Sequence, residues 1–243
     1  MGKMDKNRIY ELLSPGIFLF SNRNIPRFSP RATKVLFDIV LKHFGTELDT
    51  VYDPMCGNGI SACTLQAIFS DSIDTILASD ITDTGVAVTG HNLNMITAPE
   101  WINYRIHMLE TQGDPKSERA LRHRIKCAEL YRDEYQPGVQ PTEQKVFKAD
   151  VFNPNAKVLK FGSIDLIMTD PPYSRECVWD RDEGDVPDNP VIDFLDSMKP
   201  FLSGRGAFAL MFDRGVPLEF PGYDLVRRED LKKRDGYLLV PRN

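Results

Sequence analysis

The sequence predicts a doubly wound α/β fold, in which helices cover a mostly parallel, seven-stranded sheet. Short apolar runs alternate with helical stretches over most of the chain, a pattern typical of βαβ units. The chain has 243 residues, 42% hydrophobic and 27% charged, which is enough for one large domain. This composition excludes a disordered tail and a collagen-like fibre.

Local signals place the elements in order along the chain. Ser29 as N-cap and Pro30 as first residue begin a helix that Gly45 ends, so that 1–45 form an N-terminal extension and first helix. Further helices are expected at about 60–69, 84–95 and 190–201, and strands at 50–53, 75–79, 145–150, 163–170 and 206–212. YDLVRRED (223–230) and GYLLVP (236–241) predict a closing hairpin.

Residues 98–144 interrupt this alternation. Pro99 opens a polar stretch of two expected helices that runs to about Tyr135, and QPGVQPTEQ (136–144) has the composition of a linker. We therefore expect a single domain over 1–243 with a helical insertion at 98–144.

Charge and cysteine content narrow the classes of partner. A net charge of -5 gives no average field that attracts nucleic acid, so RNA or DNA has to meet local basic patches. The four cysteines form no CxxC pair, and the N-terminus has no apolar signal core. The apolar runs are far shorter than the ~18–20 residues of a membrane span. We expect a reduced, cytoplasmic protein with no metal site and no membrane partner.

The first motif, TVYDPMCGNGIS, is an apolar strand followed by a glycine-rich turn that opens a helix. Glycines at 57 and 59 permit a tight turn and close approach of a ligand to the backbone. With Ala62 they complete a GxGxxA, which leaves a dinucleotide cofactor open. Asp53 favours S-adenosylmethionine (SAM), because a carboxylate attracts its amino and sulfonium groups and would repel a pyrophosphate. Asp80, which ends the next strand, suits the ribose hydroxyls or a helix cap.

The second motif, SIDLIMTDPPYS, is an apolar strand that ends in Asp170-Pro171-Pro172-Tyr173. Two prolines remove two backbone donors, which leaves carbonyls and a carboxylate as acceptors beside an aromatic ring. Such a cluster suits the N–H of a planar base, and Tyr173 would stack on that base. Because this motif follows the first in the right order on one sheet, a functional site is favoured over an isolated turn.

DPMCGNG, the acid of ILASD, and DPPY together resemble motifs I, II and IV of class I SAM-dependent methyltransferases that modify base nitrogens. The resemblance implies that Asp170 and Pro171 hold the target nitrogen and that Lys148–Val151 lie beside the cofactor adenine. Asp150 would then accept from the adenine amino group or cap a turn of helix. The full set of expected cofactor contacts is Phe28, Ser29, Asp53, Pro54, Cys56, Gly57, Asn58, Gly59, Asp80, Ile81, Asp150 and Val151, and the expected catalytic set is Asp170, Pro171, Pro172 and Tyr173.

A narrower resemblance covers the chain from about Ser14 to Arg214. SPGIFLF with SPRAT, the long insertion before ADVFNP, TDPPY with a later tryptophan, and the Asp213-Arg214 pair are similar to the avilamycin-resistance rRNA methyltransferases, the AviRa family. This implies methylation of a guanine in large-subunit (23S) ribosomal RNA. The modified atom, the oligomeric state and the choice between antibiotic resistance and ribosome maturation stay open. The alternatives are a DNA amino-methyltransferase, a protein glutamine methyltransferase, a nucleotide-dependent oxidoreductase and a non-catalytic RNA-binding module.

Two basic stretches are the candidates for binding RNA phosphates. Residues 1–43 carry 8 Lys/Arg against 3 Asp/Glu, and 116–126 carry 5 against 1, whereas 165–200 carry 3 against 10. Helical spacing places three cations of the second stretch on one face, although such a run is as often a solvated surface. A base-stacking role for Trp179 competes with a packing role, and Arg214 suits a phosphate or a pair with Asp213. The expected substrate contacts are Arg119, Arg122, Lys126, Arg175, Trp179 and Arg214.

Overall fold

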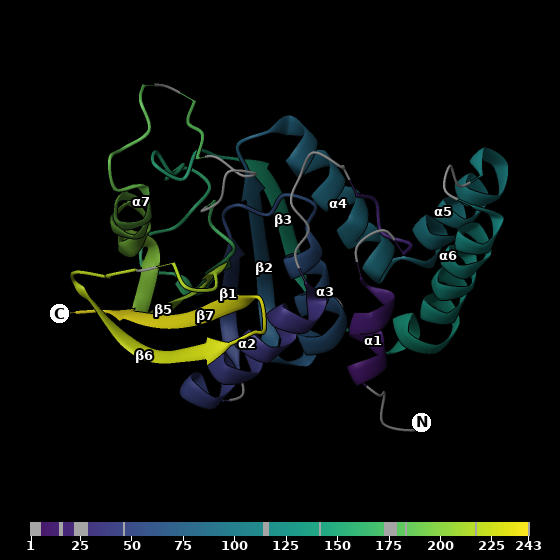
Figure 1. Ribbon diagram of the computed structural model, residues 1–243, viewed down its shortest axis with the longest axis horizontal. Helices are drawn as coiled ribbons and strands as arrows, with labels where there is room; N and C mark the ends of the chain where they lie inside the picture. Colours follow the sequence, from purple (N-terminus) through teal and green to yellow (C-terminus); the bar gives the residue numbers. More distant parts are fainter. Residues whose placement is uncertain are drawn as a thin grey trace.

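The computed structural model describes residues 6–14, 17–21, 29–45, 47–113, 117–140, 142–172, 179–182, 184–216 and 218–242. Seven strands form one sheet in the order β3-β2-β1-β4-β5-β7-β6 (Figure 1). Strands β1 to β5 pair in parallel, and β7 runs antiparallel to both β5 and β6. The strands are β1 (Leu48–Asp53), β2 (Ile73–Asp80), β3 (Glu143–Lys148), β4 (Ile164–Thr169), β5 (Leu202–Asp213), β6 (Tyr223–Asp230) and β7 (Arg234–Pro241).

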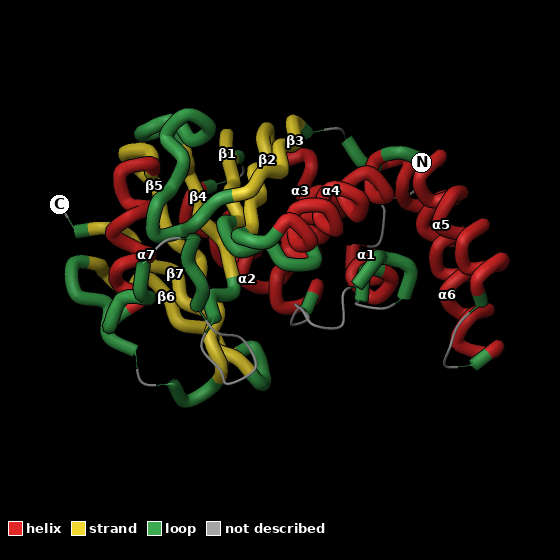
Figure 2. The backbone as a smooth tube through the Cα atoms, turned by 90° about the horizontal axis from the view of Figure 1, so that it is seen from above, coloured by secondary structure: helices red, strands yellow, loops and turns green. Residues whose placement is uncertain are grey.

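The chain winds outward from β1 to β3, then returns to the other side of β1 and continues from β4 to β6. The expected doubly wound, mostly parallel fold with seven strands is confirmed. Figure 2 shows helices on both sides of the sheet. The α-helices are α1 (Lys6–Leu12), α2 (Pro30–Phe44), α3 (Ile60–Phe69), α4 (Asp83–Thr97), α5 (Pro99–Gln112), α6 (Glu118–Leu130) and α7 (Pro190–Met198).

Two hydrophobic layers enclose the sheet because its central strands are buried on both faces. All six residues of β4 are buried. Leu166 and Met168 belong to the layer formed with α2, α3 and α4, whereas Ile167 belongs to the layer formed with α7. This sandwich fixes the carboxyl ends of the parallel strands along one edge, where ligands bind in open α/β sheets.

Local sequence signals determine the best-predicted elements. Helix α2 begins at Pro30, and the Ser29 side chain accepts a hydrogen bond from the Ala32 N–H at 3.4 Å. Gly45 ends the helix with a φ of 99°, in the region that favours glycine. Helix α3 spans the expected 60–69.

One helix was not predicted, and several strands begin earlier than expected. Helix α1 lies in the N-terminal extension, where no helix was expected. Strand β3 begins at Glu143, inside the expected linker, because that residue pairs with Thr75 of β2. Helices α5 and α6 occupy most of 98–144 and project from the end of the molecule opposite β5–β7 (Figures 1 and 2). Within the described ranges, no helix combines the length and apolarity that crossing a membrane demands.

Candidate functional site

Three carboxylates meet at the carboxyl edge of the sheet. Strand β1 lies between β2 and β4 and runs parallel to both, so their ends face the same edge. Asp53 ends β1, Asp80 ends β2 and Asp170 directly follows β4. The charges of Asp80 and Asp170 both act on Asp53, which places the two sequence motifs in one site.

Asp53 is buried, with 4% of its surface exposed. Its Oδ1 accepts hydrogen bonds from the Thr169 hydroxyl at 2.8 Å and the Met55 N–H at 3.3 Å. The pKa of Asp53 is raised from its ordinary value of 3.8 to about 7. Burial is the largest cause, the negative charges of Asp80 and Asp170 add to it, and the two hydrogen bonds oppose the shift. The site therefore favours a cationic ligand, which would offset the cost of ionising this carboxyl group.

The shape of the glycine turn depends on its backbone conformation and on its packing against α4. Gly57 and Gly59 have φ values of 53° and 71°, and a Cβ on Gly59 would lie 2.8–2.9 Å from atoms of Thr89. The Thr89 hydroxyl lies 3.2 Å from both the Gly57 carbonyl and the Cys56 Sγ. The turn thus packs directly against α4, with no space for a side chain at 59.

Asp80 braces this turn. Its Oδ2 accepts from the Gly57 N–H at 2.9 Å, and its Oδ1 accepts from the N–H and hydroxyl of Thr82 at 2.9 and 2.7 Å. Thr82 is itself the N-cap of α4 and accepts from the Gly85 N–H. A carboxylate has about four lone-pair sites. These three bonds leave about one acceptor site of the Asp80 carboxylate for a ribose hydroxyl.

A clamp that the sequence did not reveal ties the N-terminal segment to the glycine turn. The buried Asn92 of α4 donates to the carbonyls of Phe20 and Asn58 at 2.9 and 2.8 Å, and accepts from the Phe20 N–H at 2.8 Å. Arg105 of α5 donates to the Phe18 carbonyl at 2.8 Å and lies 4.3 Å from the Phe20 ring centroid. An asparagine in mid-helix carries no local signal for such a role, because its partners are 34 and 72 residues away.

Asp170 also has a partner that the motif did not indicate. Arg234, the first residue of β7, donates through Nη1 to both carboxylate oxygens of Asp170. The two side chains are 17% and 24% exposed, so the ion pair is partly shielded from solvent. The contact between the guanidinium and the carboxylate is a charge-assisted hydrogen bond. The register that pairs Asp213 with Arg234 brings this arginine to the site.

Asp150 lies in a turn rather than at the start of a helix. Its Oδ1 accepts from the Phe152 N–H at 2.8 Å, which corrects the alternative of a helix cap. Its Oδ2 accepts from the Asp182 N–H at 3.2 Å and lies 4.0 Å from Arg181 Nε. Trp179 packs 5.4 Å from the Phe152 ring, so its described contacts are those of a packing residue.

The expected RNA contacts fall into two groups. Arg119, Arg122 and Lys126 are exposed on α6, and Arg122 pairs with Glu118 at 3.1 Å. They lie on the projecting helix pair, at the end of the molecule opposite β5–β7 (Figure 1). Arg214 pairs with Asp230 at 2.9 Å, and not with Asp213.

The other expected residues adjoin those described above. Phe28, Tyr173 and Arg175 lie outside the described residues. Pro54, Ile81, Val151 and Pro171 each directly follow an aspartate, and Pro172 comes next after Pro171. Cys56 and Asn58 belong to the glycine turn, and Ser29 caps α2. Among the residues that the structure describes, no group of three or more His, Cys, Asp or Glu is arranged to hold a metal ion.

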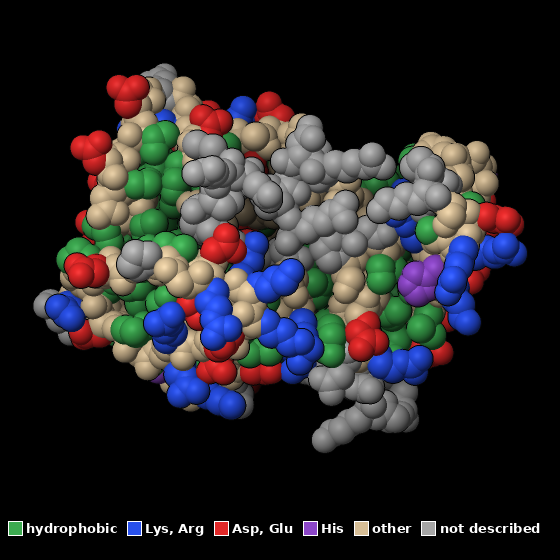
Figure 3. Space-filling model, in the orientation of Figure 1, with side chains coloured by type: hydrophobic (Ala, Val, Ile, Leu, Met, Phe, Trp, Pro, Cys, Tyr) green, Lys and Arg blue, Asp and Glu red, His purple; other side chains and the backbone are tan. Residues whose placement is uncertain are grey.

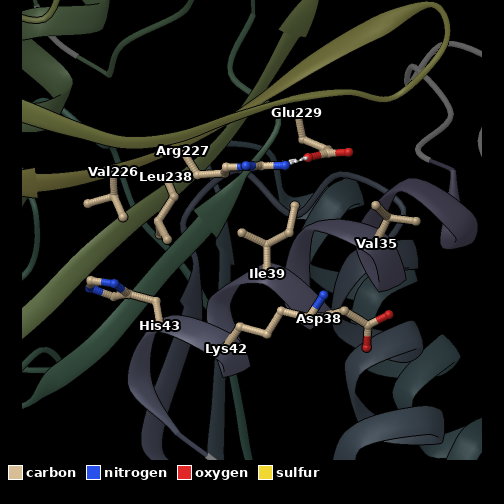
Figure 4. Close-up of a pocket in the computed structure, with 9 residues that line it drawn as sticks. All are labelled: Val35, Asp38, Ile39, Lys42, His43, Val226, Arg227, Glu229 and Leu238. Carbon is tan, nitrogen blue, oxygen red and sulfur yellow. Dashed lines mark hydrogen bonds and ion pairs between the residues drawn. The ribbon is translucent and has the colours of Figure 1, made fainter.

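A groove of about 540 Å³ lies between α2 and the β6–β7 pair (Figure 4). Ile39 and Leu238 contribute apolar surface, and Arg227 pairs with Glu229 at its rim. None of the expected site residues lines this groove.

The doubly wound sheet, the glycine turn after β1 and the acceptor motif after β4 together define the class of methyltransferases with this fold. The family model for the rRNA methyltransferase AviRa matches residues 4–233. The chain belongs to the AviRa family of rRNA methyltransferases, which confirms the prediction of an enzyme that transfers methyl groups to ribosomal RNA.

Individual relatives agree with this assignment. The chain is similar to a 23S rRNA (guanine(2535)-N(1))-methyltransferase of Streptomyces viridochromogenes, with 26% identity over 201 residues that cover 82% of this chain and 79% of that protein. Two structures of the rRNA methyltransferase AviRa from the same organism share the fold. Their TM-scores are 0.78 and 0.77, both at 23% identity, over 98% and 97% of this chain and 93% and 92% of theirs.

Proposed function

We propose that this enzyme transfers the methyl group of SAM to a ring nitrogen of a guanine in large-subunit ribosomal RNA. The observation that carries the proposal is the meeting of Asp53, Asp80 and Asp170 at one edge of the sheet, beside a glycine turn. The relative at 26% identity, named as a guanine N1 methyltransferase of 23S rRNA, supports the choice of base.

The donor set fits SAM. The cofactor carries a positive amino group and a sulfonium, and the three carboxylates attract both. Asp53 would bind the amino group, and the turn at Gly57–Gly59 would contact the cofactor through backbone alone. Asp80 would hold the glycine turn in shape and keep one acceptor site for a ribose hydroxyl, while Asp150 and Val151 would lie beside the adenine. Bound SAM supplies an electrophilic methyl group.

The binding and deprotonation of the target base would depend on Asp170. When the ring nitrogen is N1, its proton has to leave as the N–CH₃ bond forms, and Asp170 would accept that proton. Arg234 would keep the carboxylate ionised and oriented before the base arrives. Pro171 and Pro172 carry no N–H, so the backbone there offers the base acceptors only. Tyr173 would stack on the base once it has left its helix.

Contacts away from the base would come from basic side chains. Arg119, Arg122 and Lys126 form an exposed basic face on α6 that could hold RNA at a distance from the acceptor site. The projecting position of the α5–α6 pair supports contact with a large substrate (Figure 2).

The variant Asp170→Asn tests the acceptor role. We expect kcat for methyl transfer to 23S rRNA to fall by about 10²–10⁴, the range for loss of a general base. The dissociation constant for SAM, measured by calorimetry, should stay within about threefold of the wild type. Asp188→Asn, which removes an exposed carboxyl group from the same acidic stretch, is the control and should retain full activity. Full activity of the Asp170 variant would contradict the assignment.

A further inference from the structure

The turn between β6 and β7 lies beside the acceptor site. Residues 231–233 connect the two strands, and the next residue is Arg234, whose guanidinium contacts the Asp170 carboxylate. The pairing of β5 with β7 places this turn at the carboxyl end of β5, on the same edge of the sheet as the glycine turn. A side chain on this turn is therefore at most three residues along the chain from Arg234, which contacts the proposed base-binding residue Asp170.

The turn is held in one shape by several contacts. Arg214 donates through its backbone N–H to the Lys233 carbonyl at 3.1 Å and through Nη1 to the Lys232 carbonyl at 3.3 Å. The Lys232 N–H donates to Asp230 Oδ1 at 2.8 Å. Leu231 packs toward Leu36 of α2, since both side chains approach Gly236. Leu231 thus anchors the turn on the core while both lysines are exposed.

Lys232 and Lys233 differ from the other cations of this hairpin. Arg227, Arg228 and Arg242 each form an ion pair, with Glu229, Asp235 and Asp224 respectively. Both lysines are exposed, and no ion pair joins them to any residue that the structure describes. In Figure 3, Lys and Arg side chains gather over the region where Figure 1 shows this turn and the start of α2.

The backbone of Lys232 gives a second, independent observation. Its φ is 75°, and it is the one residue other than glycine with a positive φ among the described residues. Glycine adopts this conformation without steric cost, whereas a lysine there is strained. A strained residue next to a functional site is explained when its side chain does work that glycine could not do.

We propose that Lys232 and Lys233 form a phosphate-binding point that holds the backbone of the substrate RNA next to the target nucleotide. The inference rests on the proposed function, because it takes the RNA to be the substrate whose base reaches Asp170. Ammonium groups on flexible stems bind phosphates as point charges. An acidic chain needs such local cations to hold RNA, and these two lie at the edge where the base has to enter.

The test compares two double variants that remove the same charge. Lys232→Gln/Lys233→Gln removes the proposed contact, and Lys157→Gln/Lys160→Gln removes two exposed lysines from the segment leading to the amino end of β4. For each, the affinity for an unmodified 23S rRNA transcript is measured by filter binding between 50 and 200 mM salt, as is the KM for that RNA. Calorimetry gives the affinity for SAM.

We expect Lys232→Gln/Lys233→Gln to bind the RNA about 10-fold more weakly and to raise its KM. The negative slope of log affinity against log salt concentration should become shallower by about 1.4–1.8, the value for two lost phosphate contacts. SAM affinity should be unchanged, and the control pair should resemble the wild type. Wild-type RNA binding by the 232/233 variant, or an equal loss in both pairs, would overturn the proposal.

Lys232→Gly separates the side chain from the fold. Glycine relieves the strained φ, so this variant should unfold at a temperature no lower than that of the wild type while its RNA affinity falls. Unchanged RNA affinity in this variant would count against a role for Lys232. If the wild type binds rRNA through these lysines but transfers no methyl group to it, the proposed function fails and the phosphate-binding point stands.

Discussion

Asp53 is a buried carboxyl group whose ionisation is unfavourable in the folded protein. A buried carboxyl group next to two other carboxylates is costly to ionise, and its pKa is raised to about 7 by that burial and by those charges. Asp165, at the opposite end of the central strands, is buried as well. There burial also raises the pKa, but hydrogen bonds from Ser203, the Asp49 N–H and Arg205 outweigh burial and lower it. Ionisation of Asp53 becomes favourable when a cation binds beside it, whereas Asp165 already pairs with the Arg205 guanidinium.

The variants Asp53→Asn and Asp165→Asn should therefore change stability in opposite directions. Because the folded pKa of Asp53 is raised, its stabilising effect is full at low pH and is lost as pH rises through about 7. At pH 8, Asp53→Asn should raise the free energy of unfolding by about 1 kcal/mol or more. Asp165→Asn should lower it, because a buried, hydrogen-bonded ionised group is lost. Urea unfolding at pH 8 measures both, and the same sign in the two variants would contradict this account.

The affinity for SAM should depend on the ionisation of the same carboxyl group, that of Asp53. The wild-type affinity should rise with pH through about 7, as Asp53 ionises and can pair with the cationic ligand. In Asp53→Asn the affinity should be weaker and independent of pH over this range. Calorimetric titrations from pH 6 to 8 measure it, and a pH-dependent affinity that survives in the variant would assign the proton to another group.

Arg234 offers a test of orientation as distinct from charge. Arg234→Lys keeps the positive charge but loses the planar group that reaches both oxygens of Asp170, and Arg234→Gln loses the charge. We expect kcat to fall in both, more in the glutamine variant, with SAM affinity retained. Wild-type kcat in both variants would mean that Arg234 serves the fold alone.

At the residue scale, the sequence predicted those site residues that belong to contiguous motifs. Asp53, Asp80 and Asp170 each stand at the end of an apolar run, and the order of these runs along the chain placed the motifs on one sheet. Arg234 was not predicted because its partner Asp170 lies 64 residues away in the chain. Asn92 was not predicted because its partners lie 34 and 72 residues away. Neither residue belongs to a recognisable local pattern. The packing role of Trp179 likewise depends on Phe152, which no motif links to it.

At the scale of elements, α4 supports the cofactor site without being part of a motif. Its N-cap Thr82 binds Asp80, Thr89 contacts the glycine turn, and Asn92 holds both the turn and the N-terminal segment. One face of the helix thus determines the position of the turn. The Asp80 side chain occupies the space beside Gly85, where an added Cβ would come within 2.4 Å of the carboxyl carbon.

Two glycines of α4 form a matched pair for testing this. Gly85→Ala should displace the Asp80 carboxylate, break its bond to Gly57 and weaken SAM binding by about tenfold or more, the value of one lost charged hydrogen bond. Gly90→Ala meets no atom within 4 Å and should stabilise the helix by about 0.5–1 kcal/mol with unchanged SAM affinity. Calorimetry and thermal unfolding measure both. Equal effects of the two substitutions on SAM affinity would contradict the supporting role of α4.

Elements with local start and stop signals were predicted with correct boundaries. Ser29, Pro30 and Gly45 delimit α2 through backbone chemistry that tertiary contacts do not change. Strand β3 began earlier than expected because β2 offers pairing partners beyond the apolar run. Helix α1 contributes Ile9 and Leu12 to the core, but it is too short to give a clear period.

At the scale of the whole molecule, the helical stretch 98–144, which the sequence analysis interpreted as an insertion, has contacts that favour a bracing role. The Tyr131 ring lies 5.3 Å from the Phe18 ring, and Arg105 of α5 contacts Phe18 and Phe20. The insertion therefore fixes the segment that Asn92 clamps to the glycine turn. The sequence indicated an insertion from its break in alternation, but not this contact, which joins residues 87 to 113 positions apart in the chain.

The central claim concerns the site as a whole, and one measurement tests it most directly. Purified protein is incubated with isotope-labelled SAM and unmodified 23S rRNA, with duplex DNA and ribosomal protein as parallel substrates, and the RNA is digested for nucleoside mass spectrometry. The account predicts label in a single guanosine of the 23S rRNA, on a ring nitrogen, and none in DNA or protein. Label in DNA or protein, or no transfer to rRNA despite tight SAM binding, would contradict it.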